Sequence, residues 1–298
     1  MPEPPELTVT REIAPGAKVS PRATIGPFTV IGPEVRIGPG TVVGRRVTIL
    51  GRTTIGRDNR IDDGCVLGAV PQDLKYAGQP TYLIIGDRNR LDVNVTIHVG
   101  TELGGYLTRI GNDNVLAAAV HVAHDCYLDD RTYLGPCVCL AGHVRVETGA
   151  VVGEYTGAHH FTTIGRFSHV ASRTPVRRDV PPFTVFGSLG CYTAPPAVRG
   201  VNEAGLAAAG LAEADRRALR DCIRHLLQDE QALAVKVRHY LQRHDLPEPV
   251  RVLCEFCRRS LEGKFGRRRE AYRGQMPPEA REYLPPEALA AIEGMGRT

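Results

Sequence analysis

The sequence predicts a β-solenoid, made of stacked coils of short strands, followed by a C-terminal helical domain. Two observations predict this fold class. Aliphatic residues recur at every sixth position over most of residues 13–176, and Ala- and Leu-rich amphipathic segments replace that period after residue 187. The 298-residue chain is 42% hydrophobic but contains no Trp, which suits a thin and regular core of Val, Ile, Leu and Ala.

Residues 1–12 precede the first repeat and are expected to form an N-terminal extension. They contain no apolar core of the kind that a signal peptide has, and no apolar run in the chain approaches the roughly 18 residues that span a bilayer. We therefore expect a cytoplasmic protein without a membrane span. Eight cysteines without a signal peptide indicate reduced thiols.

Residues 13–187 carry the repeat. A small or β-branched residue stands four positions after each aliphatic one, and Gly commonly follows the aliphatic residue, as in Ile25-Gly26 and Thr29. We interpret each unit as a short strand whose aliphatic side chain points inward, followed by a tight corner, and such units bury their apolar faces only by stacking. Two interruptions, 68–84 and 99–109, are predicted to be loop insertions of the kind that often carry function. The aliphatic positions of the repeat are Ile13, Val19, Ile25, Ile31, Ile37, Val43, Ile49, Ile55, Ile61, Leu67, Ile85, Leu91, Ile97, Ile110, Leu116, Val122, Leu128, Leu134, Leu140, Val146, Val152, Ala158, Ile164, Val170 and Val176.

Residues 188–267 are predicted to be the helical domain, with helices over 205–228, 229–244 and 249–261. Residues 268–298 are basic and interrupted by Pro, and we expect a loosely attached tail.

The net charge of +4 is too small for typical nucleic-acid binding. Cys254 and Cys257 form a CxxC motif without a second pair at zinc-ribbon spacing, which favours packing on a helix over metal or redox use.

The repeat resembles that of the hexapeptide-repeat transferases. Their fold is a left-handed parallel β-helix with three repeats, or 18 residues, in each coil, and the resemblance implies the same handedness and coil length here. The alternative is a different β-solenoid without enzymatic activity.

A coil of 18 residues gathers half of the chain's ten histidines. His124, Gly142 and His160 are spaced 18 apart, and the remaining members lie beside them: His121, His143 and His159. Such a cluster suits either metal ligation or acid–base chemistry near neutral pH. The zinc-dependent γ-class carbonic anhydrases share this scaffold, but their His-x4-His pair is absent, so we expect no metal. Instead Asp125 directly follows His124, which places a carboxylate beside a candidate base.

Five motifs resemble a more specific family, the acyl-ACP:UDP-N-acetylglucosamine O-acyltransferases, where ACP is acyl carrier protein. The similarity covers roughly residues 8–267. It implies transfer of an acyl chain from an ACP thioester to the sugar 3-hydroxyl of UDP-N-acetylglucosamine, the first step of lipid A biosynthesis, by a homotrimer whose active sites lie between subunits and need no cofactor. The motifs are Gln72-Asp-Leu-Lys-Tyr-Ala-Gly78, Thr96-Ile-His98, Ala123-His-Asp-Cys126, Leu140-Ala-Gly-His143 and Asp179-Val-Pro-Pro-Phe183.

In this reaction a neutral imidazole takes the proton of the sugar hydroxyl as that hydroxyl attacks the thioester. We assign this role to His124, with Asp125 orienting its ring. By the resemblance, the Gly142 N–H stabilises the oxyanion. The resemblance also implies that the substrate is bound by Asp73, by Lys75 of a neighbouring subunit, and by His121, His143, His159, His160 and Asn202. A solvated loop charge is the alternative for Lys75.

The sequence departs from the family at several of these positions. His160 replaces a usual Gln, while Ala204 and Ala208 replace a Glu and an Arg that follow the expected nucleotide contact Asn202. Glu154 and Ser172 replace glycines of the acyl groove, which favours a shorter or differently shaped groove. Three functions remain open: the O-acyltransferase, a related acyltransferase on another (amino) nucleotide sugar, and a non-catalytic solenoid that binds carrier protein or nucleotide.

Overall fold

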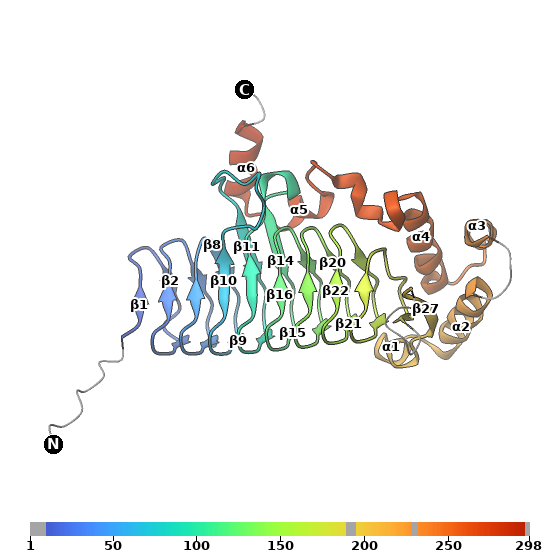
Figure 1. Cartoon of the computed structure of the whole chain (residues 1–298), viewed down its shortest axis with the longest axis horizontal. Coiled ribbons are helices and arrows are strands. Elements are labelled where there is room, and N and C mark those ends of the chain that lie inside the picture. The colour runs from blue at the N-terminus through green and yellow to red at the C-terminus, as the bar shows by residue number, and fades with distance from the viewer. Residues whose placement is uncertain (1–9, 189–194, 228–231, 296–298) are drawn as a thin grey trace, which may run out of the picture.

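The computed structural model describes residues 10–188, 195–227 and 232–295. Most of the expected N-terminal extension and the start of the expected helix over 229–244 lie outside these residues. Within them the chain winds into a long parallel β-helix with helices at its C-terminal end and along one edge (Figure 1). None of the helices in these ranges is long and apolar enough to cross a membrane.

The β-helix has three sheets whose strands are stacked in parallel, except that β27 at the end of the third sheet is antiparallel. The first sheet contains β1 (Glu12–Ile13), β4 (Val30–Ile31), β7 (Thr48–Ile49), β10 (Val66–Ala69), β13 (Thr96–His98), β16 (His121–Val122), β19 (Cys139–Leu140), β22 (Gly157–Ala158) and β25 (Pro175–Val176). The second sheet contains β2 (Lys18–Val19), β5 (Arg36–Ile37), β8 (Arg52–Ile55), β11 (Tyr82–Ile85), β14 (Leu107–Ile110), β17 (Tyr127–Leu128), β20 (Arg145–Val146) and β23 (Thr163–Ile164). The third sheet contains β3 (Thr24–Ile25), β6 (Val42–Val43), β9 (Arg60–Ile61), β12 (Arg90–Leu91), β15 (Val115–Leu116), β18 (Tyr133–Leu134), β21 (Val151–Val152), β24 (His169–Val170), β26 (Thr184–Gly187) and β27 (Ala197–Val201).

The core runs along the axis of the β-helix and consists of the aliphatic residues of the repeat. From Ile25 to Val176 all of these residues are buried, as the period predicts. The exceptions are in the first coil, where Ile13 is 40% exposed and Val19 is half-buried, because β1 pairs only with β4 and β2 only with β5. Each inward aliphatic side chain therefore needs neighbours in the coils on both sides.

Both insertions leave the β-helix at the corner between the first and second sheets, which we call the first corner. One connects β10 to β11 and the other connects β13 to β14, and the second contains the short helix η1 (Glu102–Gly104). The flanking strands extend into both predicted loop ranges, so the loops themselves are shorter than expected. The insertions lengthen the spacing between paired residues, because Val66 pairs with Thr96 and Thr96 pairs with His121.

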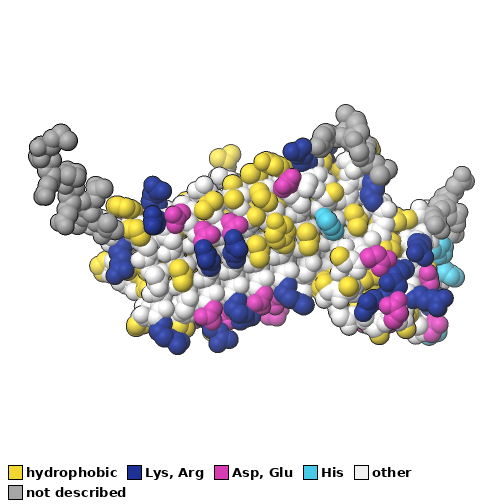
Figure 2. Space-filling model, turned by 90° about the horizontal axis from the view of Figure 1, so that it is seen from below, with side chains coloured by type: hydrophobic (Ala, Val, Ile, Leu, Met, Phe, Trp, Pro, Cys, Tyr) yellow, Lys and Arg dark blue, Asp and Glu magenta, His cyan; other side chains and the backbone are white. Residues whose placement is uncertain are grey.

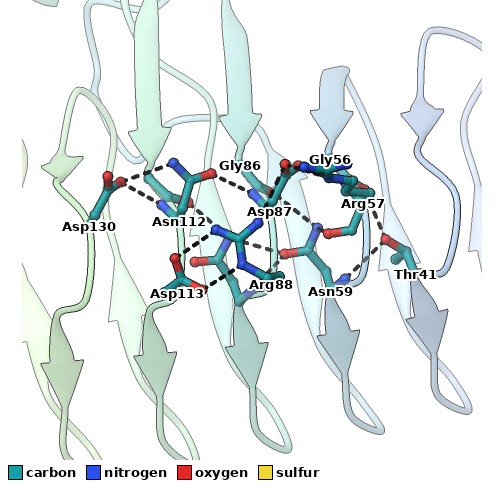
Figure 3. Close-up of polar contacts among 12 residues, drawn as sticks. Thr41, Gly56, Arg57, Asn59, Gly86, Asp87, Arg88, Asn112, Asp113 and Asp130 are labelled. Atoms are coloured by element: carbon teal, nitrogen blue, oxygen red, sulfur yellow. Dashed lines mark hydrogen bonds and ion pairs between the residues drawn. The ribbon is translucent and has the colours of Figure 1, made fainter.

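The corner between the second and third sheets is tied by a ladder of polar side chains (Figure 3). Asn59 donates from Nδ2 to the Gly86 carbonyl at 2.8 Å, and buried Asn89 donates to Asn59 Oδ1 at 3.0 Å. Arg88 forms a bidentate pair with Asp113 at 2.7 and 2.8 Å. The two asparagine side chains satisfy the corner carbonyls of Gly86 and Gly111, which would otherwise lack a partner.

The helical domain packs on the C-terminal end of the β-helix. It contains α1 (Glu203–Ala208), α2 (Glu213–Leu227), α3 (Leu233–Leu241) and α4 (Glu248–Glu262). The single helix expected over 205–228 is divided near Gly210, which has φ +67°, and the antiparallel strand β27 that precedes α1 was not anticipated. Cys254 and Cys257 are buried on α4, as packing on a helix requires.

The expectation of a loose tail from residue 268 is wrong for the described residues. The chain continues through η2 (Lys264–Gly266), η3 (Arg268–Tyr272), α5 (Pro278–Tyr283) and α6 (Pro286–Met295), which return along the β-helix toward its insertions (Figure 1). Prolines that we expected to interrupt regular structure stand instead at the first position of α5 and α6, where Pro favours helix initiation. Apolar side chains of this segment are buried against the β-helix: Ala280, Leu284 and Ala288 lie on Tyr106, Leu107 and Tyr127.

Candidate active site

The predicted histidine cluster lies at the first corner, in three successive coils. His121 pairs with Cys139 and Cys139 pairs with Gly157, so residues 18 apart do stack. At the corner, His143 N donates to the His124 carbonyl at 3.0 Å. Asp125, His143 and Phe161 hold the same place in their coils and all have φ between 60° and 65°. The same left-handed conformation recurs at corners along the β-helix, for example at Arg46 and Arg131, so it is a feature of the coil that the site uses.

His124 and Asp125 form a hydrogen-bonded dyad. The distance from His124 Nδ1 to Asp125 Oδ2 is 2.7 Å, and the Asp125 side chain is fully buried. Both carboxylate oxygens also accept hydrogen bonds from Thr101 of the second insertion, Oδ1 from its N–H at 2.8 Å and Oδ2 from its hydroxyl at 2.6 Å. With Nδ1 donating to the carboxylate, Nε2 of the neutral ring carries the lone pair that a general base needs.

Gly142 lies directly against the His124 ring. A Cβ at this position would lie 2.5 Å from His124 Cε1 and 2.7 Å from Nε2, closer than any real contact. Among the described residues the Gly142 N–H has no backbone carbonyl partner. The missing side chain therefore leaves room for a reacting group between the base and a free backbone donor.

His143 is held as a neutral ring beside the dyad. It stacks on Phe161 with ring centroids 4.2 Å apart and an interplanar angle of 6°, and it meets His124 edge-to-face at 5.2 Å. Burial lowers the pKa of His143 to about 4, because nearby Asp125 only partly offsets the loss of solvation and His124 and Arg269 add repulsion. At neutral pH this imidazole offers a hydrogen-bonding group without a charge.

A pocket of about 350 Å³ opens over the dyad. Both insertions and the C-terminal segment contribute to its wall, as do Gly142, His143 and His160. Asp73 and Lys75 line it from the same chain as His124, so the pocket holds Lys75 without the neighbouring subunit that the resemblance implied. The residues that complete the wall are Gln72, Leu103, His124, Ala141, Phe161, Arg273 and Gly274.

His121 and His159 line a second pocket, of about 410 Å³, on the face of the first sheet. His121 Nδ1 lies 2.8 Å from Thr96 Oγ1, its ring meets His98 edge-to-face at 5.3 Å, and burial followed by repulsion from His98 lowers its pKa. The His159 ring lies 3.8 Å from that of His160, so the two pockets adjoin at the first corner.

Asn202 is not brought to either pocket within one chain. Its side chain is buried at a different corner, where Nδ2 donates to the Phe167 carbonyl at 2.8 Å. Ala204 and Ala208 are both exposed on α1.

The sequence analysis missed Thr101, Phe161 and Arg273. Thr101 reaches Asp125 only because the second insertion folds back, and this contact has no periodic signal. Phe161 had a usable signal, since it stands 18 residues after His143 and hence directly above it.

Metal ligation is possible in principle at one place among the described residues. His124, Asp125 and His143 offer ligand atoms within 4.8 Å of one another. A metal there would have to displace the hydrogen bonds that already occupy Asp125 and His124 Nδ1, so the arrangement fits a general-base dyad better. The adjacent Cys126 is fully buried and burial raises its pKa to about 12, which leaves it a protonated packing residue.

Known proteins are similar to this chain in sequence and fold. A family model described as bacterial transferase hexapeptide (six repeats) matches residues 12–45, and one described as UDP N-acetylglucosamine O-acyltransferase, domain 2, matches residues 179–265. A solved UDP-N-acetylglucosamine acyltransferase is 32% identical with a TM-score of 0.79, over 86% of this chain and 95% of that one.

Two further solved structures agree over similar lengths. The UDP-N-acetylglucosamine O-acyltransferase of Moraxella catarrhalis is 31% identical with a TM-score of 0.75, over 83% of this chain and 94% of that one. The UDP-N-acetylglucosamine acyltransferase of Francisella novicida is 28% identical with a TM-score of 0.78, over 83% of this chain and 89% of that one.

Proposed function

Because the chain belongs to the UDP-N-acetylglucosamine acyltransferase family, we propose that it transfers an acyl chain from an ACP thioester to the 3-hydroxyl of UDP-N-acetylglucosamine, the first step of lipid A biosynthesis. The observation that carries this proposal is the His124–Asp125 dyad, whose open Nε2 lies over Gly142 in a pocket. Acyl transfer from a thioester to an alcohol requires a base and an oxyanion donor in this arrangement.

In the proposed reaction His124 Nε2 takes the proton of the sugar hydroxyl while the hydroxyl oxygen attacks the thioester carbonyl carbon. Asp125 stabilises the imidazolium that forms, and the Gly142 N–H donates to the developing oxyanion. When the tetrahedral intermediate collapses, the carbon–sulfur bond breaks and the imidazolium returns its proton to the departing thiolate. The products are the sugar ester and the free thiol of the carrier protein, and no cofactor takes part.

We consider a second acceptor because the residues expected to contact the nucleotide differ from those that the family resemblance implies. Exposed Ala204 and Ala208 carry neither the carboxylate nor the guanidinium that the family resemblance led us to expect, and Asn202 already binds the Phe167 carbonyl. A 3-amino nucleotide sugar, acylated on nitrogen, is therefore the second acceptor that we propose to test.

We also propose that the protein acts as a homotrimer. The outward side chains of the third sheet include Val42, Val115, Tyr133 and Val151, and Figure 2 shows hydrophobic side chains gathered along the middle of the molecule's lower face, where strands of this sheet lie. Exposed apolar patches of this kind mark interaction surfaces.

We place the reaction in the cytoplasm. All seven described cysteines are free, and the buried sulfur atoms of Cys222 and Cys254 lie 3.9 Å apart as two thiols, which suits a reducing compartment.

The test is an activity screen with acyl-ACP thioesters of several chain lengths and two acceptors, UDP-N-acetylglucosamine and its 3-amino analogue. Mass spectrometry identifies the product, and release of the ACP thiol gives the rate. His124→Ala should lower the rate at least about 10²-fold while the protein remains folded, since a positioned general base typically contributes 10²- to 10⁴-fold. Thiol release that persists within threefold in this variant, or no acylated product with either acceptor, would contradict the proposal.

A further inference from the structure

The segment that follows the helical domain contributes a cation to the candidate active site. The family model ends its match at residue 265, whereas Arg273 and Gly274 line the pocket over the dyad. We propose that Arg273 binds a phosphate group of the substrate. This inference deepens the proposed function and rests on it for the identity of the substrates.

Several contacts fix the position of Arg273. Arg268 N donates to buried Asp179 at 2.9 Å and its guanidinium pairs with Glu147 at 2.5 Å. Arg269 Nε donates to the His143 carbonyl at 3.1 Å, while its guanidinium pairs with Glu279 of α5. The segment is therefore fastened to the same coil that supplies His143, and Arg273 follows only four residues later.

The charge of Arg273 is only partly used by the protein. Its Nε and Nη2 donate to Glu270 at 2.9 and 3.2 Å, but Arg267 pairs with the same carboxylate at 2.5 Å. One carboxylate between two guanidinium groups leaves one net positive charge. The Glu270 side chain is 2% exposed and that of Arg267 is 8% exposed, whereas that of Arg273 is 57% exposed, so this charge is available on the pocket side.

A stack of rings connects Arg273 to the dyad. Its guanidinium lies over Phe161, 4.5 Å from the ring centroid, Phe161 stacks on His143, and His143 meets His124 edge-to-face. The cation thus stands beside the reacting centre without touching the base. Arg recognises phosphate through several N–H donors in a fixed plane, and each charge-assisted bond is stronger than a neutral one.

Both proposed substrates carry phosphate, bonded to the reacting sugar in the acceptor and at the far end of the phosphopantetheine arm from the thioester in the donor. The acceptor has the diphosphate of UDP, and the donor has the phosphate of its phosphopantetheine arm. The shared chemistry is a phosphate ester, and measurements with the two molecules distinguish them.

Binding by calorimetry tests the inference without depending on catalysis. The full-length protein is titrated with UDP against uridine, and with 4′-phosphopantetheine against pantetheine. For at least one pair the phosphorylated ligand should bind about tenfold or more tightly, and Arg273→Gln should remove most of that difference. Arg273→Lys should restore part of it, and Arg281→Gln, a matched loss of charge at an exposed position of α5, should leave it unchanged. If the ratio of affinities for the phosphorylated and unphosphorylated ligand is the same in the unmodified protein and in Arg273→Gln for both pairs, the inference is overturned.

Kinetics then identify the source of the phosphate. Arg273→Gln should raise KM about tenfold for the substrate whose phosphate it binds and change kcat less than threefold. A protein that prefers phosphorylated ligands through Arg273 but forms no acylated sugar would refute the proposed function and leave this inference intact. Loss of kcat with unchanged KM for both substrates would instead contradict a phosphate-binding role.

Discussion

Thr101 binds both oxygens of the Asp125 carboxylate, one through its N–H and the other through its hydroxyl. Because the two residues are 24 positions apart, this contact exists only where the second insertion folds onto the first corner. The loop therefore fixes the orientation of the acid that in turn orients His124.

Removing the Thr101 hydroxyl should weaken the dyad while the fold persists. Thr101→Val keeps the side-chain volume and the N–H bond but loses the 2.6 Å bond to Oδ2, and a hydrogen bond to a charged group is worth about 1.5–3 kcal/mol. We expect kcat to fall about tenfold or more, whereas Thr101→Ser should stay within threefold of the unmodified protein. If Thr101→Val and Thr101→Ser keep the Tm of the unmodified protein and have equal kcat, the hydroxyl does not position Asp125.

Adding one methyl group at Gly142 should displace the base. The new Cβ in Gly142→Ala would lie 2.5 Å from His124 Cε1, so the imidazole must move. We expect kcat to fall at least tenfold. The matched control is Gly32→Ala at the first corner of an early coil, where the nearest atom would be an ordinary 3.4 Å away. Similar kcat values for the two variants would mean that His124 tolerates the displacement.

Acid should destabilise the protein through His143. The pKa of His143 is about 4 in the folded state and about 6.5 in the unfolded state, so the unfolded chain binds the proton first as pH falls. The stabilising contribution is complete above about pH 6.5 and is lost as pH decreases toward 4. Urea unfolding at pH 7 and pH 5 should show that the unmodified protein loses more stability than His143→Gln, and a pH-independent difference between the two would contradict the shift.

The repeat register predicts opposite effects at adjacent positions. Ile37 is 3% exposed and Arg36 is exposed, both on β5. Ile37→Asp buries an unpaired carboxylate and should cost several kcal/mol, about 3 or more, whereas Arg36→Asp should stay within about 0.5 kcal/mol. Thermal unfolding of the two variants compares them directly, and equal shifts in Tm would mean that the inward and outward positions are reversed.

The β-helix and the stacking of His124, Gly142 and His160 could be predicted because one period determines both. A six-residue repeat fixes which side chain points inward, and a constant coil length then places residues 18 apart above one another. This rule fails across the insertions, where Thr96 pairs with His121 instead. It also says nothing about residues outside the coils, which is why Thr101 was missed.

The C-terminal segment escaped prediction for a different reason. Its helices α5 and α6 are short, and each buries a few small apolar residues such as Ala280 and Ala288 rather than a long stripe. Burial here also depends on a partner surface, since a Cβ on Gly105 would lie 2.8 Å from Pro277 Cδ and keep the segment away. The composition of this segment resembles that of a solvated tail, because the surface on which it packs is formed by a distant part of the chain.

The docking of this segment also has a consequence for synthesis on the ribosome. Each coil contacts the coil made just before it, so the β-helix can form progressively as the chain emerges, but Arg269 contacts the carbonyl of a residue 126 positions earlier. At about 5–20 residues per second, the last wall of the pocket is synthesised roughly 6 to 25 s after His143. A nascent chain whose coils are already folded therefore carries the dyad for many seconds before it has the arginine that we expect to bind phosphate.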